Sequence, residues 1–161
     1  MGEFFKVSPS VLIPRDETEL VVNRAVSLIQ QNNFKQILDI GTGSGCIACT
    51  IAKRTDAVVL GTDISSDALN IALDNVTKLN INNKAVFRKS DLFDKIREDE
   101  KFDMIISNPP YIPENTELSD EVMHEPNIAL FAKENGLYFY RKIIESAPAC
   151  LNKNGILIFE L

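Results

Sequence analysis

The chain has 161 residues, of which 45% are hydrophobic and 25% are charged, and its net charge is −6 at pH 7. This length suits one domain with a single core, and no apolar run approaches the roughly 18 residues that a membrane-crossing helix needs. The start lacks the basic and apolar segments of a secretory signal, and the 17 Lys and Arg residues are dispersed, which argues against direct nucleic-acid binding. We therefore expect a cytoplasmic protein that binds neither a membrane nor nucleic acid directly.

The three cysteines allow two interpretations. The pair Cys46 and Cys49 has the spacing of a redox or metal motif, but the chain has no second pair, and its one histidine, His124, is far away in sequence. Both cysteines fall in the apolar run 46–52, and an odd number of cysteines fits a reducing compartment. We expect buried small side chains and no metal site.

The first elements expected in chain order are a hairpin and a helix. Short β-like segments at 4–7 and 11–13 flank a Ser-Pro-Ser turn. Asp16 can cap the following helix with Glu19 three positions on, and the apolar positions of that helix share one face. Residues 1–16 are expected to be a hairpin and linker, and residues 17–161 the main domain.

Strands and helices alternate over the rest of the chain. This alternation predicts a doubly wound α/β fold with a mostly parallel sheet, right-handed crossovers and helices on both faces. A loop of about 28 residues follows the fourth strand, at a carboxyl end where ligands bind in such sheets. The expected strands are 36–40, 57–62, 85–89, about 103–107 and 156–159, and the expected helices are about 45–53, 66–80 and 137–150.

A glycine-rich segment, residues 39–46 with the sequence DIGTGSGC, joins the first of these strands to a helix. Glycines let main chain approach a ligand closely, but the dinucleotide fingerprint needs glycine where Cys46 stands. A turn without a ligand is the alternative. The segment resembles the cofactor loop of class I S-adenosylmethionine methyltransferases, which have a Rossmann-like fold. The resemblance implies cofactor contacts from Asp39, Gly41, Thr42, Gly43, Ser44 and Gly45.

Two further strand ends carry acidic residues. Asp63 ends the second strand, where a carboxylate can accept both ribose hydroxyls of an adenosine-containing ligand. Capping of the next helix is the alternative role. Ile64, the residue after it, is included in the expected cofactor site. By resemblance, Asp91 would bind the adenine amino group and Leu92 would contact the ring face, although Asp is also common in loops.

The segment after the fourth strand indicates the chemistry. An amide nitrogen is a poor nucleophile, so a site can help by accepting hydrogen bonds from both of its N–H groups. Asn108 offers a side-chain carbonyl, Pro109 offers a main-chain carbonyl, and the proline pair with Pro110 stiffens the loop. Tyr111 offers a ring face to a flat substrate. We expect Asn108, Pro109 and Tyr111 to be catalytic, with all four residues at the acceptor and Asn108 also at the cofactor. A plain turn or a proline-motif ligand is the alternative.

Four segments together are similar to the peptide-chain release factor glutamine methyltransferases: residues 11–19, the glycine loop, 108–113 and 124–131. The resemblance implies methyl transfer from S-adenosylmethionine, without a metal, to the amide nitrogen of the glutamine in the Gly-Gly-Gln loop of a release factor. The release factor would then be the protein partner. Asn-Pro-Pro-Tyr alone is shared with adenine and guanine amino methyltransferases, so two alternatives stay open: a DNA or RNA exocyclic-amine methyltransferase, and an inactive cofactor-binding fragment.

Some positions depart from this family. Asp16 stands where the family usually has proline, and residues 132–137 read AKENGL where it often has Gly-Gly-Glu-Asp-Gly-Leu. Family members also carry an N-terminal helical domain and a C-terminal antiparallel hairpin, so we expect a truncated chain. Its last strand would lie at a sheet edge and favour self-association.

Overall fold

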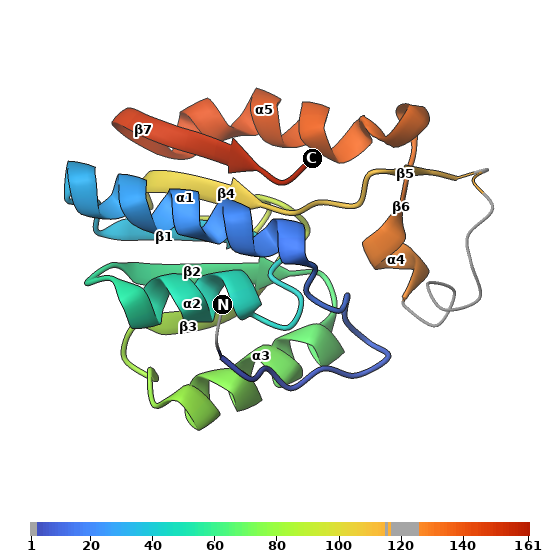
Figure 1. Ribbon diagram of the computed structural model, residues 1–161. Helices are drawn as coiled ribbons and strands as arrows, with labels where there is room; N and C mark the ends of the chain where they lie inside the picture. Colours follow the sequence, from blue (N-terminus) through green and yellow to red (C-terminus); the bar gives the residue numbers. More distant parts are fainter. Residues whose placement is uncertain (1–2, 115, 117–125) are drawn as a thin grey trace.

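Five parallel strands form the central sheet, in the order β3-β2-β1-β4-β7 (Figure 1). The computed structural model describes residues 3–114, 116 and 126–161. The doubly wound α/β fold is confirmed. The strands are β1 (Gln36–Ile40), β2 (Val58–Asp63), β3 (Ala85–Lys89), β4 (Phe102–Ser107), β5 (Ile112–Pro113), β6 (Phe131–Ala132) and β7 (Leu151–Phe159), and the helices are α1 (Asp16–Asn32), α2 (Cys46–Arg54), α3 (Ser66–Leu79), α4 (Asn127–Leu130), the 3-10 helix η2 (Glu134–Gly136) and α5 (Tyr138–Cys150).

Two apolar layers cover the two faces of the sheet. Ile37 of β1 packs with α1, α2 and α3 on one face, while its neighbour Leu38 packs with α5 on the other. The alternation follows from the two-residue period of a strand. The loop after β3 completes the second layer with Leu92, Phe93 and Ile96. Cys46 and Cys49 are buried in the first layer, as expected.

The prediction of a hairpin near the N-terminus is wrong. Residues 4–13 form no strand, and their main chain is held by a side chain instead. The Lys6 N–H donates to Asn75 Oδ1 (2.7 Å), and Asn75 Nδ2 donates to the carbonyls of Lys6 (3.0 Å) and Ser44 (2.8 Å). A buried amide on α3 thus satisfies the main-chain groups that a second strand would have paired.

The expected cap of α1 is also wrong by one position. Arg15 is the N-cap and makes no side-chain cap bond, whereas Asp16 is the first helical residue. The acidic residues Asp16, Glu17 and Glu19 fill the first turn, where the helix dipole favours negative charge.

The last strand begins earlier than expected. Leu151 pairs with Phe102, and Ile156 then pairs with Met104, so residues 152–155 bulge from the ladder. Asn154 in this bulge has a φ of 66°, which asparagine tolerates better than most residues. The regular part of β7, residues 156–159, matches the expected strand. Within the described residues, β7 lies at one edge of the sheet. Self-association through it stays a prediction.

The long loop after β4 contains structure of its own. β5 and β6 pair in parallel, Ile112 with Phe131, and α4 and η2 flank β6. Part of one family-like segment, including His124 and Glu125, lies outside the described residues. Within the described ranges, no helix is long and apolar enough to cross a membrane.

Candidate functional site

A cavity of about 560 Å³ opens at the carboxyl ends of the central strands. It lies over the boundary between β1 and β4, where the chain order of the strands reverses and where open α/β sheets bind ligands. Its volume falls in the usual range for small-molecule sites. The predicted site residues that line it are Gly41, Thr42, Gly43, Ser44, Asp63, Ile64, Asp91, Leu92, Asn108, Pro109 and Pro110.

The three glycines of the loop after β1 have different roles. All have positive φ, at 70° for Gly41, 55° for Gly43 and 75° for Gly45. A Cβ on Gly41 or Gly43 would meet no atom within 4 Å, whereas a Cβ on Gly45 would lie 2.9 Å from the Ala72 Cβ. Gly41 and Gly43 therefore leave open space for a ligand, and Gly45 allows α2 to pack closely against α3. Gly45, expected at the cofactor, does not line the cavity.

The variants Gly43→Ala and Gly45→Ala form a matched pair. Each should cost about 1–2 kcal/mol for a left-handed alanine. Gly45→Ala should lower the free energy of unfolding further because of its clash with Ala72, while Gly43→Ala should weaken ligand binding more. Urea unfolding and calorimetric titration would measure both effects. Equal losses of stability would contradict the packing role of Gly45.

Asp39 is a buried support of the loop and does not line the cavity. Its Oδ2 accepts a hydrogen bond from Thr42 Oγ1 (2.6 Å), and its Oδ1 has no partner. Burial raises the pKa of Asp39 to about 7, although the bond from Thr42 opposes this shift. Asp39, expected at the cofactor, therefore acts on the loop from beneath.

The raised pKa of Asp39 makes stability depend on pH. The folded protein binds this proton more tightly than the unfolded chain, whose Asp has a pKa near 3.9, so the contribution is full below about pH 4 and is lost as pH rises to about 7. We expect wild type to lose about 1 kcal/mol per pH unit across this range relative to Asp39→Asn, which cannot ionise. Chemical unfolding of both proteins at pH 5, 6 and 7 would measure the difference, and parallel profiles would contradict it.

Asp63 connects the glycine loop to the start of α3. Its Oδ2 accepts from the Gly43 N–H (2.9 Å), and its Oδ1 accepts from the Ser65 N–H (2.9 Å). The N-cap of α3 is Ser65, whose side chain accepts from Ala68, so the capping role considered for Asp63 belongs to its neighbour. Burial raises the pKa of Asp63. A carboxylate fixed at the cavity wall suits the recognition of hydroxyl groups.

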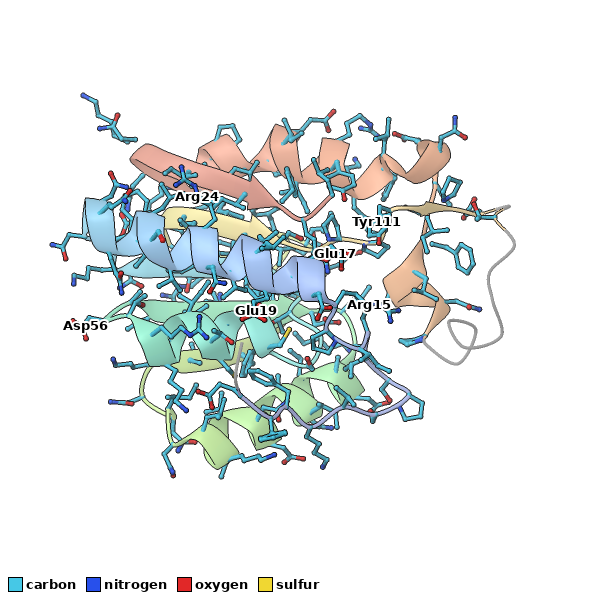
Figure 2. The ribbon with its side chains drawn as sticks, viewed as in Figure 1. Arg15, Glu17, Glu19, Arg24, Asp56 and Tyr111 are labelled. Carbon is cyan, nitrogen blue, oxygen red and sulfur yellow. The ribbon has the colours of Figure 1, made fainter. Side chains whose placement is uncertain are left out.

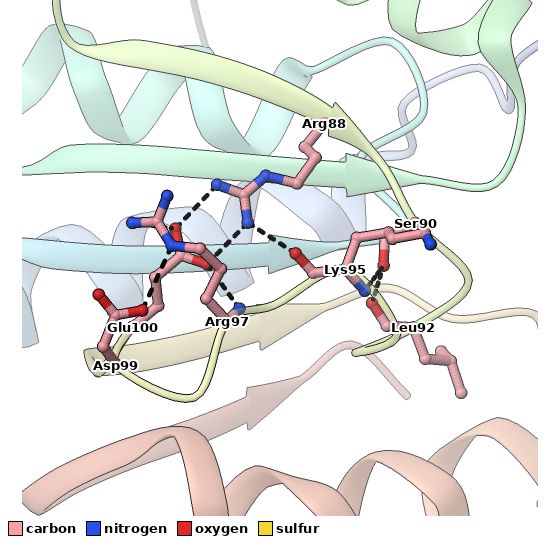
Figure 3. Close-up of polar contacts among 7 residues, drawn as sticks. All are labelled: Arg88, Ser90, Leu92, Lys95, Arg97, Asp99 and Glu100. Carbon is pink, nitrogen blue, oxygen red and sulfur yellow. Dashed lines mark hydrogen bonds and ion pairs between the residues drawn. The ribbon is translucent and has the colours of Figure 1, made fainter.

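A polar network fixes the loop after β3 (Figure 3). The Arg88 guanidinium makes two bonds to Glu100 (2.7 and 2.8 Å) and lowers the pKa of that carboxyl to about 2. Ser90 Oγ donates to the Leu92 carbonyl (3.0 Å) and accepts from the Lys95 N–H (3.0 Å). Leu92 is thereby held at a φ of 44°, a costly conformation for leucine. Asp91 and Leu92 both line the cavity.

Asn108 lies between the large cavity and a second one of about 180 Å³. Tyr111 and Arg15 line the second cavity, and Figure 2 shows both at the end of the sheet opposite Asp56. Tyr111 is 48% exposed and does not line the large cavity, whereas Pro109 and Pro110 do. The expected acceptor residues are therefore divided between two cavities, which share Leu12, Asn108 and Ala129 in their walls.

Gly136 supports the position of Tyr111. A Cβ on Gly136 would lie 2.1 Å from the Tyr111 carbonyl oxygen, and Gly136 has a φ of 89°. Only glycine fits this contact without displacing the main chain. Segment 132–137, where the sequence departs from the family, keeps this glycine and packs closely against the main chain of Tyr111.

The sequence did not predict some of the residues at the site. Leu12, Pro14 and Thr18 line the large cavity, so the segment that resembles the release factor enzymes forms part of its wall. The signal was the family-like segment 11–19, to which no site role was assigned. Glu160 accepts a hydrogen bond from Asn108 Nδ2 (2.8 Å), and no sequence pattern pointed to it. The described residues contain no group of three or more His, Cys, Asp or Glu side chains that could hold a metal ion.

The sheet order, the glycine loop and the strand-end carboxylates define an α/β domain of the kind that binds nucleotide-like cofactors. The chain belongs to the methyltransferase small domain family, whose model matches residues 16–159. It is 42% identical to the release factor glutamine methyltransferase of Clostridium acetobutylicum over 166 residues, with 100% of this chain and 58% of that protein covered. The same enzyme of Streptococcus pneumoniae is 43% identical, with 99% and 57% covered. The chain thus spans just over half the length of these relatives.

Solved structures support the fold. A ribosomal protein L11 methylase from Lactobacillus delbrueckii subsp. bulgaricus matches with a TM-score of 0.65 and 23% identity, over 90% of this chain and 60% of that chain. A 16S rRNA methyltransferase from T. thermophilus, in complex with AdoMet and guanosine, matches with a TM-score of 0.67 and 19% identity, over 91% and 34%. At these identities the likeness shows a shared methyltransferase fold.

Proposed function

We propose that this chain is the catalytic domain, residues 17–161, of an enzyme that methylates the side-chain amide nitrogen of a release factor glutamine. The observation that carries the proposal is the position of Asn108 between two cavities. The larger cavity would take S-adenosylmethionine, and the smaller would admit a flat acceptor side chain. The names of the relatives add a release factor as the expected partner and a glutamine as the expected acceptor. The family resemblance implies that this glutamine lies in the Gly-Gly-Gln loop.

The larger cavity fits S-adenosylmethionine in size and chemistry. Gly41 and Gly43 leave open space beside the glycine loop, and Asp63 supplies an anionic acceptor at the wall for the ribose hydroxyls. Leu92 supplies an apolar surface and Asp91 a hydrogen-bond acceptor for the adenine ring. When bound, S-adenosylmethionine would supply an electrophilic methyl group on a positively charged sulfur.

The chain's own residues would orient the acceptor amide. The Asn108 side-chain carbonyl and the Pro109 main-chain carbonyl would accept hydrogen bonds from its two N–H groups, which directs the nitrogen lone pair toward the cofactor cavity. Tyr111 would pack against the flat amide from the second cavity. As the new N–C bond forms, the bond between the methyl carbon and the sulfur would break, leaving S-adenosylhomocysteine. The nitrogen would then release one proton to water, so no general base is required before attack.

Mass spectrometry of a release factor after incubation with this chain and S-adenosylmethionine tests the proposal. We expect a gain of one methyl group on the Gly-Gly-Gln glutamine and none when that residue is replaced by alanine. Methylation of an adenine-containing oligonucleotide in place of the protein would indicate an exocyclic-amine methyltransferase. Calorimetric binding of the cofactor without any transfer would indicate a cofactor-binding fragment.

A further inference from the structure

We propose that Glu160 is a positioning residue that sets the orientation of the Asn108 side-chain amide. It would hold the NH2 group of Asn108 and so leave the carbonyl oxygen for the acceptor. This inference rests on the proposed function, because it concerns the group assigned to the acceptor nitrogen.

Main-chain hydrogen bonds fix Glu160 next to Asn108. Glu160 follows β7, and its N–H donates to the carbonyl of Ser107, the residue before Asn108 (3.1 Å). The Tyr140 hydroxyl of α5 donates to the Glu160 carbonyl (2.9 Å). The residue is 5% exposed. The main chain of Glu160 is therefore held in place between the ends of β4 and β7, which fixes where its side chain begins.

The NH2 group of Asn108 donates a hydrogen bond from Nδ2 to Glu160 Oε1 (2.8 Å). An ionised carboxylate can only accept hydrogen bonds, so the NH2 end of Asn108 must face it. The Asn108 carbonyl oxygen then lies on the opposite side of the amide, where it is left for the acceptor. A flipped Asn108 would present N–H groups to the N–H groups of the acceptor, which would repel it.

Burying the carboxyl group of Glu160 would be unfavourable if the residue served only to fill space. Burial raises its pKa, Glu17 on α1 raises it further, and Thr18 and Asn108 oppose the shift. Arg15 and Tyr111 line the same small cavity, and the second carboxylate oxygen, Oε2, has no hydrogen-bond partner. A glutamine of the same size would avoid burying charge, but its amide could hold Asn108 in either orientation. A carboxylate, which only accepts hydrogen bonds, holds the Asn108 amide in a single orientation.

The isosteric variant Glu160→Gln tests this role. We expect its kcat for methyl transfer to fall at least about tenfold, with the cofactor Kd unchanged within twofold, because Glu160 does not line the large cavity. In an Asn108→Ala background the same change should have no further effect on kcat, since both residues act through one amide. The rate for wild type should rise with pH as Glu160 ionises, and Glu160→Gln should lose that dependence.

Nuclear magnetic resonance of the Asn108 side-chain amide gives a readout that does not require activity. Its signals, identified by their loss in Asn108→Ala, should shift with pH in wild type and should not follow that titration in Glu160→Gln. Glu145→Gln, at an exposed ion pair with Arg141, is the matched control and should change neither signal nor rate. Glu160→Asp, which keeps an acceptor-only group, should transfer methyl faster than Glu160→Gln.

Two outcomes would overturn the inference: Asn108 signals that titrate alike in wild type and Glu160→Gln, or additive losses of kcat in the double variant. A wild-type chain that methylates no release factor would instead count against the proposed function. In that case the Asn108 signals would still decide whether Glu160 orients the amide.

Discussion

Replacing Asn108 with alanine should lower the rate of methyl transfer by about a hundredfold or more, while the affinity for S-adenosylmethionine stays within a few fold. The large cavity keeps its glycine loop and Asp63 in this variant, so most cofactor contacts remain. The acceptor loses the carbonyl that would fix its nitrogen, and Glu160 loses its hydrogen-bond donor. Single-turnover kinetics and calorimetric titration would separate the two effects.

Asn152→Ala is the matched control for this experiment. Asn152 lies toward the opposite end of β7, where its amide donates to Asp103 Oδ1 (2.8 Å), so its loss removes a similar bond away from the cavity. Its rate should match wild type. Near-normal turnover by Asn108→Ala, with Asn152→Ala also active, would reject the mechanism proposed for the acceptor amide.

Asp63→Ala should weaken binding of S-adenosylmethionine by roughly 1–3 kcal/mol, the usual cost of removing one partner from buried polar groups. The carboxylate is the acceptor assigned to the ribose, and it also accepts the Gly43 and Ser65 N–H groups. Calorimetric titration would measure the loss, with thermal unfolding as a test of folding.

A second variant separates ribose recognition from support of the loop. Asp63→Asn keeps one carbonyl oxygen for a main-chain N–H but cannot accept two ribose hydroxyls. We expect it to bind the cofactor weakly and, because its NH2 group would face the other main-chain N–H, to unfold somewhat below the wild-type temperature. Asp67→Ala, on the exposed face of α3, should bind normally. Wild-type affinity in Asp63→Ala would remove the ribose assignment.

The sequence predicted the alternating core of the fold well because each element carries a local signal. Buried parallel strands are apolar runs, and helices such as α3 show apolar groups at helical spacing. The prediction of an N-terminal hairpin was wrong because it could not include a contact between residues far apart in the sequence. The main-chain groups of this segment bond to Asn75, nearly 70 residues away, and no local pattern shows that partner.

The site was predicted in outline, and the detail depended on packing. Gly43 and Gly45 look alike in the sequence, yet only three-dimensional contact shows that Gly45 faces Ala72 and not the cavity. Asp39 was predicted at the cofactor; it is buried, bonds to Thr42 and does not line the cavity, and its contact with a cofactor stays a prediction. Glu160 follows an ordinary apolar strand, and its contact with Asn108 depends on β4 and β7 being neighbours in the sheet.

Because the chain order of the strands reverses between β1 and β4, the residues assigned to the cofactor and those assigned to the acceptor come from different parts of the sequence. Residues assigned to the cofactor follow β1, β2 and β3, and residues assigned to the acceptor follow β4 and extend through β5 and β6. Asn108 is the predicted site residue that borders both cavities. Under the proposed function, substitutions at Tyr111, Ile112 and Leu130, which line the small cavity alone, would change acceptor preference while the glycine loop stays intact. This separation makes the scaffold a natural starting point for engineered transfer to other planar nitrogens, with the cofactor half left unaltered.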